Sequence, residues 1–299
     1  MARGAGRELN GLSAVQWYAA PGKLNLLLHI LGRRADGYHE LQTIFRLIDR
    51  ADRVGIAPHD DGVLQRLDVL PGVPPQDDLC LRAAVRMKDL ARARKGSAAE
   101  RLGARIALDK RLPMGAGLGG GSSDAATVML ALNRLWDLNL GRAALIAEAA
   151  QLGADVPFFV FGRSALGEGV GERLSALELR PAWYLVLVPP VSVSTREVFA
   201  AATLTCNAKP LKISPFFQGL GKNDLEAVVV ARYPEVGVHL DWLRRHRPGA
   251  RMTGSGACVF AAFESAAEAR ALQSMLPASM HGFLAEGLAR HPLHDWAEG

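Results

Sequence analysis

The sequence predicts an α+β protein in two domains, with strands and helices alternating much as they do in α/β proteins. Apolar stretches of strand character alternate with segments of helical period in both halves of the chain. Such alternation is typical of helices packed on sheets. The length of 299 residues is enough for two domains that each have a core. We expect a disordered extension at residues 1–15, a first domain at 16–178 and a smaller second domain at 179–299.

The predicted elements follow one another at short intervals. Strands are expected at residues 18–31 (two strands flanking a turn at 21–22), 43–57, 64–70, 104–112, 158–161, 183–188, 258–263 and 283–287. Helices are expected at residues 79–93, 122–136, 142–151, 225–233, 236–245 and 266–275. Asp77 and Asp78 directly precede the first of these helices, and we expect them to cap it.

The composition excludes several classes of protein. No stretch approaches the roughly 18 consecutive apolar residues that a membrane-spanning helix needs. The N-terminal stretch carries arginines but no apolar core, so it does not resemble a secretory signal. The three cysteines, Cys80, Cys206 and Cys258, lie far apart, which fits neither a metal knuckle nor a disulfide framework and favours a reducing cytoplasm.

The net charge of +5 is compatible with a nucleic-acid partner, but aromatic residues make up only 6% of the chain. They are not interleaved with the basic stretches, and no RNA-binding signature is present. A mildly positive field also suits small anionic substrates. We therefore expect a small-molecule substrate, no nucleic acid and no membrane, in a monomer or weak homodimer.

The most informative segment is PMGAGLGGGSSDAA at residues 113–126, which has five glycines within seven positions. Glycine is tolerated where a Cβ would block a turn or a ligand. Backbone N–H groups at the start of the following helix would form a site for phosphate. We expect the serines and Asp124 to cap that helix. The segment predicts nucleotide phosphate binding at Pro113, Met114, Gly115, Ala116, Gly117, Leu118, Gly119, Gly120, Gly121, Ser122 and Ser123.

Three familiar types of glycine-rich loop do not fit this segment: the P-loop, the dinucleotide-binding loop and the loop of protein kinases. A P-loop needs a lysine where Gly121 precedes Ser122. Gly115, Gly117 and Gly120 satisfy the dinucleotide pattern, but the strand before them alternates and a second helix follows where a buried strand should return. The HRD and DFG strings of protein kinases are absent. A mobile linker would not need capping residues at the start of the helix.

Four segments in order resemble the GHMP kinases, the family of galactokinase, homoserine kinase and mevalonate kinase. They are APGKLN at 20–25, the glycine loop, LGADVPFFV at 152–160 and RMTGSGACVFAAF at 251–263. The resemblance implies an N-terminal ATP-binding domain of ribosomal-S5-domain-2-like fold and a smaller C-terminal α/β sandwich that binds substrate. It also implies ATP and Mg²⁺ as cofactors. The turn at 254–257 would close the site between the domains, although a plain tight turn explains it equally well.

The same resemblance assigns the catalytic pair and the adenine contacts. Asp155 would accept the proton of the substrate hydroxyl, and Lys23 would orient it and hold negative charge. On composition alone, Asp155 could be a turn residue before a proline. Lys110 and Asp78 would lie near adenine, although the family often has asparagine where Asp78 stands.

The segment GRRADGYHELQTIF at residues 32–45 resembles one branch of the family, which phosphorylates the 2-hydroxyl of cytidine-diphospho-methylerythritol. The alternative is another small-molecule kinase of homoserine or mevalonate type. The branch implies a cytosine held between Tyr38 and Phe199 with His39 at its edge, since aromatic rings stack and an imidazole hydrogen-bonds. From the residues alone, Tyr38 and His39 could be ordinary surface and Phe199 helix core. The implied substrate-binding residues are Asn25, Tyr38, His39, Thr195 and Phe199.

Two functions of other classes stay open at this point. A nucleotide- or RNA-binding protein without catalysis would bind ATP and not turn it over. A dehydrogenase that transfers hydride would bind a nicotinamide cofactor.

Overall fold

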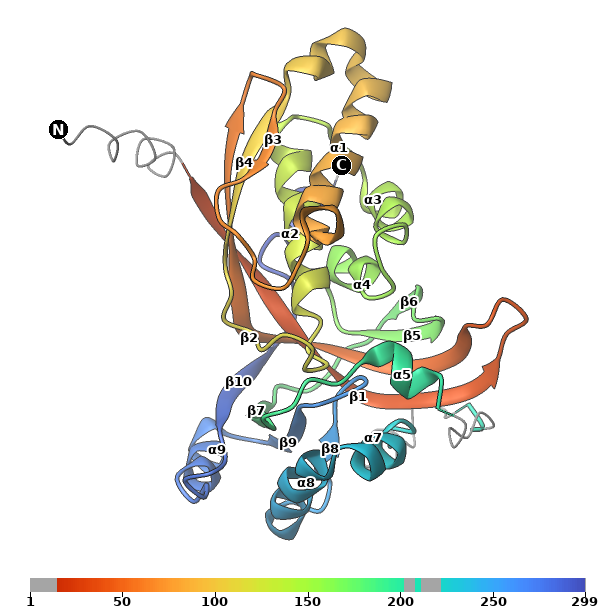
Figure 1. Cartoon of the computed structure of the whole chain (residues 1–299), viewed down its shortest axis with the longest axis vertical. Helices are drawn as coiled ribbons and strands as arrows, with labels where there is room; N and C mark the ends of the chain where they lie inside the picture. The colour runs from red at the N-terminus through yellow and green to blue at the C-terminus, as the bar shows by residue number, and fades with distance from the viewer. Residues whose placement is uncertain (1–14, 202–207, 211–221, 299) are drawn as a thin grey trace, which may run out of the picture.

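The computed structural model describes residues 15–201, 208–210 and 222–298. The extension expected at residues 1–15 lies outside this part except for its last residue, and so does Cys206. A long β-hairpin crosses the molecule, with helices of the first half of the chain on one side and elements of the second half on the other (Figure 1). The predicted α+β class is therefore confirmed, while the division at 178/179 stays a prediction.

One sheet of ten strands runs through both halves of the chain. Its spine is the antiparallel hairpin of β1 (Gln16–Arg33) and β2 (His39–His59), and β2 also pairs with β4 (Gly103–Asp109) and β5 (Ala165–Gly169). The order along the main path is β3-β4-β2-β10-β7-β9-β8, and β6 pairs with β5. The remaining strands are β3 (Leu64–Arg66), β6 (Arg173–Ala176), β7 (Trp183–Leu187), β8 (Arg251–Met252), β9 (Val259–Phe263) and β10 (Gly282–Leu288).

The helices of the first half pack against the hairpin and enclose the first core. They are α1 (Leu79–Lys95), α2 (Gly120–Leu135), α3 (Arg142–Ala149) and α4 (Val156–Phe161), with short turns η2 (Pro75–Asp77) and η3 (Gly96–Arg101). Every residue of α2 from Ser123 to Asn133 is buried. Most of these residues are apolar, as in a helix enclosed by the core, and the buried polar ones are Ser123, Asp124, Thr127 and Asn133.

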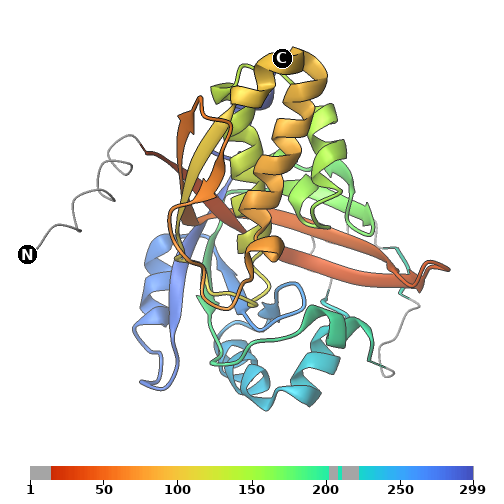
Figure 2. The same ribbon diagram turned by 45° about the horizontal axis from the view of Figure 1, so that its top comes forward.

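The second half forms its own core around β7, β8 and β9. Its helices are α5 (Thr195–Phe199), α7 (Glu226–Arg232), α8 (Pro234–His246) and α9 (Ala266–Gln273). Leu28 and Ile30 of β1 belong to this second core, so the hairpin serves both cores. After β10 the chain returns to the first core through η4 (His294–Ala297), and the C-terminus lies beside the helices of the first half (Figure 2).

The prediction of a strand at residues 158–161 is wrong, because these residues belong to helix α4. The helix begins with Pro157 in its first turn, and Val156 to Val160 are all buried. A short run that is apolar on every side has no helical period, so sequence cannot distinguish it from a buried strand.

Two other predictions need correction. Residues 18–31 form one continuous strand instead of two, with a register shift between Pro21 and Gly22 in place of a turn. This shift is a β-bulge, which bends a strand without ending it. The strand predicted at 64–70 ends at Arg66. In the part of the chain that the structure describes, no helix is both long and apolar enough to cross a membrane.

Candidate active site

A cavity of about 820 Å³ collects the predicted site residues from both halves of the chain. Its walls come from the hairpin, the glycine loop, the start of α4, helix α5 and the turn at 254–256. Ser123 is the one predicted site residue that does not line it. Those that do are Lys23, Asn25, Tyr38, His39, Asp78, Lys110, Pro113, Met114, Gly115, Ala116, Gly117, Leu118, Gly119, Gly120, Gly121, Ser122, Asp155, Thr195 and Phe199.

The glycine loop enters α2 through a chain of left-handed turns. Gly115, Gly117 and Gly119 have φ angles of 63°, 78° and 70°, which favour glycine. Helix α2 begins at Gly120, and no side chain caps it. Its first N–H groups and the positive end of its dipole therefore face an anion that enters the cavity. This geometry fits a phosphate site.

The prediction that the serines and the aspartate cap α2 is wrong, because the helix begins two residues earlier than expected. Ser123 and Asp124 lie inside it and are buried. The Ser123 hydroxyl donates to the backbone oxygen of Pro21 at 2.7 Å, which ties the helix to β1. Of the two serines, only Ser122 lines the cavity.

The second glycine turn, at residues 254–257 between Thr253 and Cys258, holds the loop from the other half of the chain. Thr253 Oγ1 donates to the oxygen of Gly117 at 3.3 Å, and the N–H of Cys258 donates to the oxygen of Ala116 at 3.1 Å. A Cβ on Gly117 would lie 2.3 Å from the Thr253 oxygen. The turn thus supports the glycine loop and also lines the cavity. Its role as a tight turn is therefore compatible with a role in closing the site.

Lys23 and Asp155 form an ion pair in the cavity wall, with Nζ and Oδ2 3.4 Å apart. The Lys23 side chain is 4% exposed and that of Asp155 is 34% exposed, so the carboxylate is the accessible partner. Lys23 Nζ also donates to Asn25 Oδ1 at 2.5 Å. Asn25 Nδ2 donates to Thr43 Oγ1 at 2.8 Å, and that hydroxyl donates to the oxygen of Leu27 at 2.6 Å. Two strands therefore hold the buried ammonium against Asp155.

The glycine loop lies directly against this pair. The N–H of Lys23 donates to the oxygen of Leu118 at 2.9 Å. A Cβ on Gly119 would come within 3.1 Å of Lys23 Cε and 3.0 Å of the Phe159 ring. Because the loop and the pair are this close, a phosphate at the start of α2 would lie beside Lys23 and Asp155.

Lys110 lies between two buried carboxylates in the part of the cavity near α1. Its Nζ donates to Asp52 and, at 3.0 Å, to Asp124. Asp52 also accepts from the backbone N–H groups of Arg111 at 2.6 Å and Leu112 at 2.7 Å. Burial raises the pKa of Asp124 to about 7, against the opposing charge of Lys110. Burial disfavours the ammonium, but the charges of Asp124 and Asp52 raise the pKa of Lys110 overall.

Asp78 is fixed in the same part of the cavity. Its Oδ1 accepts from the N–H of Cys80 at 2.8 Å, which caps α1 as predicted, and its Oδ2 pairs with Arg66 at 2.6 Å. Asp77 belongs to η2, and the capping of α1 falls to Asp78 alone. The apolar residues that line the cavity together with Asp78 include Leu70, Val73, Leu79 and Leu108.

Another part of the cavity lies between α5 and the loop at 34–38 that joins β1 to β2, and aromatic and imidazole side chains line it. The rings of His39 and Phe199 have centroids 5.2 Å apart, and Tyr38 is 63% exposed at the rim. Burial and the charge of Arg33 lower the pKa of His39, so its neutral ring offers one donor and one acceptor. Thr195 Oγ1 lies 2.7 Å from Ser255 Oγ, which joins α5 to the second glycine turn.

Comparison with known proteins identifies the family of this chain. The model of the GHMP kinases N terminal domain matches residues 79–163, and that of the GHMP kinases C terminal matches residues 206–282. The chain is 57% identical over 281 residues to the 4-diphosphocytidyl-2-C-methyl-D-erythritol kinase of Thiobacillus denitrificans, covering 94% of this chain and 98% of the relative. The chain belongs to the GHMP kinase family.

Further relatives carry the same name as the first. The enzyme of Nitrosospira multiformis is 55% identical and covers 93% of each chain. A crystal structure of 4-(cytidine 5'-diphospho)-2C-methyl-D-erythritol kinase superposes with a TM-score of 0.79 at 36% identity, covering 91% of this chain and 99% of that one. A mevalonate kinase superposes with a TM-score of 0.62 at 16% identity over 91% of this chain and 99% of that one, which shows the fold alone. The branch that residues 32–45 indicated is confirmed over the homoserine and mevalonate types.

Sequence reasoning missed several residues that build this GHMP kinase site. Asp52 and Arg66 lie on strands outside the quoted motifs, and Thr43 lies within the segment at 32–45 without having been singled out; each contacts a site residue. Asn223 donates to the oxygen atoms of Met252 at 2.9 Å and Gly254 at 2.8 Å, and so holds the second glycine turn. For Thr43, a polar residue beside the apolar residues Ile44 and Phe45 is the signal that was available, whereas Asp52 lies in the charged run 49–53 and gave none.

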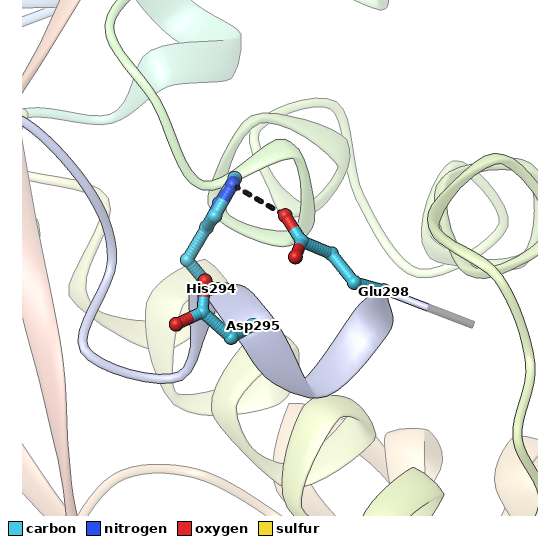
Figure 3. A group of neighbouring side chains, drawn as sticks. All are labelled: His294, Asp295 and Glu298. Carbon is cyan, nitrogen blue, oxygen red and sulfur yellow. Dashed lines mark ion pairs between the residues drawn. The ribbon is translucent and has the colours of Figure 1, made fainter.

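A separate group of possible metal ligands lies on η4, outside the cavity (Figure 3). His294 Nε2 and Glu298 Oε1 are 3.6 Å apart, and Asp295 offers a third ligand atom nearby. Burial and the charges of Arg142 and Arg290 lower the pKa of His294. These positive charges oppose a bound cation, and we assign no metal site to η4.

Proposed function

We propose that this GHMP kinase transfers the γ-phosphoryl group of ATP to the 2-hydroxyl of 4-diphosphocytidyl-2-C-methyl-D-erythritol. The observation that carries the proposal is the Lys23–Asp155 pair, which lies against the glycine loop and lines the same cavity as the aromatic side chains. The acceptor is the molecule named in the relatives at 50–57% identity.

Asp155 is the group that receives the proton of the acceptor hydroxyl. In a loose phosphoryl-transfer transition state this proton leaves late, so orientation of the hydroxyl matters more than the strength of the base. The hydrogen bonds from Lys23 to Asn25 and onward to Thr43 supply that orientation, because they fix the ammonium that holds Asp155. Lys23 also lies where it can attract negative charge on the transferred group.

ATP occupies the glycine-loop side of the cavity in this proposal. The N–H groups at the start of α2 bind the phosphates, and Lys110 and Asp78 contact the adenine in the part of the cavity near α1. The Ser122 hydroxyl lines the cavity at that helix start, and hydroxyl and phosphate oxygens are ligands that Mg²⁺ accepts. Ser122 would hold Mg²⁺, which neutralises phosphate charge when bound.

The acceptor occupies the part of the cavity between α5 and the loop at 34–38. Tyr38 and Phe199 stack on the cytosine, and neutral His39 hydrogen-bonds to its edge. Asn25, which accepts from Lys23, and Thr195, which is in the same helix as Phe199, also line the cavity and would contact the substrate. The buried, unpaired thiols of Cys80 and Cys258 fit the expected reducing cytoplasm, which stays a prediction together with the monomeric or weakly dimeric state.

A coupled ADP-release assay with purified protein, ATP and Mg²⁺ tests the proposal. We expect turnover with cytidine-diphospho-methylerythritol and none with homoserine, mevalonate or no acceptor. Turnover with another acceptor would refute the cytosine site and leave the catalytic pair standing. ATP binding without any turnover would favour a binding protein.

A further inference from the structure

Two guanidinium groups line the cavity together with Tyr38, His39 and Phe199, and no step of the proposed phosphoryl transfer uses them. They belong to Arg33, at the end of β1, and Arg196, in α5. Among the described residues, neither side chain has a carboxylate within ion-pair distance. By contrast, neighbouring Arg34 pairs with Asp36 at 2.9 Å. Unpaired arginines that face a cavity are suited to bind a phosphate group from outside the protein.

Both arginines are adjacent to the ring site, by which we mean the part of the cavity lined by Tyr38, His39 and Phe199. Arg33 lies opposite His39 in the β1–β2 hairpin, and the His39 ring lies 5.2 Å from that of Phe199. Arg196 precedes Phe199 by three residues in α5, a spacing that puts both side chains on one face of a helix. Thr195, next to Arg196, contacts Ser255 of the second glycine turn. Arg33 and Arg196 therefore both lie beside His39 and Phe199, since Arg33 is opposite His39 in the hairpin and Arg196 shares α5 with Phe199.

The charge of the surrounding wall supports an anionic ligand here. The carboxylates among the described lining residues are those of Asp77, Asp78, Asp124 and Asp155. The first three lie near α1 and the start of α2, and Asp155 is paired with Lys23. No described lining carboxylate is thus left to oppose a diphosphate beside Arg33 and Arg196.

We infer that Arg33 and Arg196 bind the diphosphate of the acceptor and select acceptors that carry one. The inference rests on the proposed function, because that acceptor has its diphosphate between the cytidine and the alcohol. A ligand with its base at Phe199 and its hydroxyl at Asp155 must pass its diphosphate between these two points. Homoserine and mevalonate have no such group and would leave both guanidinium groups unpaired.

Calorimetric titration with CDP and with cytidine tests the inference, with the ATP subsite filled by a non-hydrolysable ATP analogue. The double variant Arg33→Ala/Arg196→Ala is compared with Arg101→Ala/Arg270→Ala, which removes two exposed arginines outside the cavity. We expect CDP affinity to fall on the order of tenfold for each cavity arginine. Cytidine affinity and the KM for ATP should stay within about twofold, and the control should match the wild type.

Three outcomes would overturn the inference. Unchanged CDP affinity in the cavity variant would show that the arginines do not touch the diphosphate. An equal loss of affinity for CDP and for cytidine would show that the two arginines support base binding or the fold instead of the diphosphate. Failure of the wild type to bind either ligand would refute the proposed acceptor itself, and the inference with it.

Discussion

Replacing two glycines of the same loop by alanine should change stability in opposite directions. At Gly117 an added Cβ would lie 2.3 Å from the Thr253 oxygen, and φ is +78°. At Gly121 the nearest atom is Leu79 Cδ1 at 3.6 Å, an ordinary contact, and the residue is within helix α2. The two substitutions add the same methyl group, so only the local structure separates them.

The magnitudes follow from those positions. A left-handed backbone costs alanine about 1–2 kcal/mol, and displacing a packed backbone carbonyl costs about 1–3 kcal/mol more. Gly117→Ala should therefore lower the free energy of unfolding by about 2–5 kcal/mol. Gly121→Ala should raise it by roughly 0.5–1 kcal/mol, because alanine loses less backbone entropy than glycine in a helix.

Denaturant unfolding of the ligand-free variants measures these changes, and ATP titration measures a second effect. Because Gly121 lines the phosphate side of the cavity, its alanine variant should bind ATP roughly tenfold more weakly despite its higher stability. Equal destabilisation by both substitutions would refute the close approach of the loop and the second glycine turn. Wild-type ATP affinity in Gly121→Ala would refute phosphate binding at the start of α2.

Three further predictions concern the catalytic pair, the ring site and the buried carboxylate. Asp155→Asn should abolish turnover in the ADP-release assay and leave ATP affinity within a few-fold, and substantial residual turnover would exclude Asp155 as the proton acceptor. Tyr38→Ala should raise the KM for the cytidyl acceptor far more than that for ATP, and equal effects would contradict stacking. Burial raises the pKa of Asp124 to about 7 from an ordinary 3.8, so the folded protein holds a proton that the unfolded chain releases. Its contribution to stability should therefore be present at low pH and decline between about pH 4 and 7. Asp124→Asn should flatten that decline in unfolding measurements at pH 5 and 8, and an unchanged slope would show that Asp124 does not titrate there.

The sequence alone determined the features that depend on neighbours along the chain. Glycine permits the positive φ that Gly115, Gly117 and Gly119 adopt, and the helix after them follows from its apolar period. The capping of α1 by Asp78 is also local, since cap and helix are adjacent. These local patterns, together with the family motifs, identified the glycine loop and the residues that gather around it.

Only the tertiary structure decided which distant groups meet. Residues 158–161 form a helix where the sequence was equally compatible with a strand, and the earlier start of α2 turned Asp124 from an expected cap into the buried partner of Lys110. Asp52 and Arg66 reach the site across strands, from positions that no sequence spacing connects with it. The physical reason is that a cap or a turn is set within a few residues. The partner of a buried charge, in contrast, depends on how the sheet brings separate segments together.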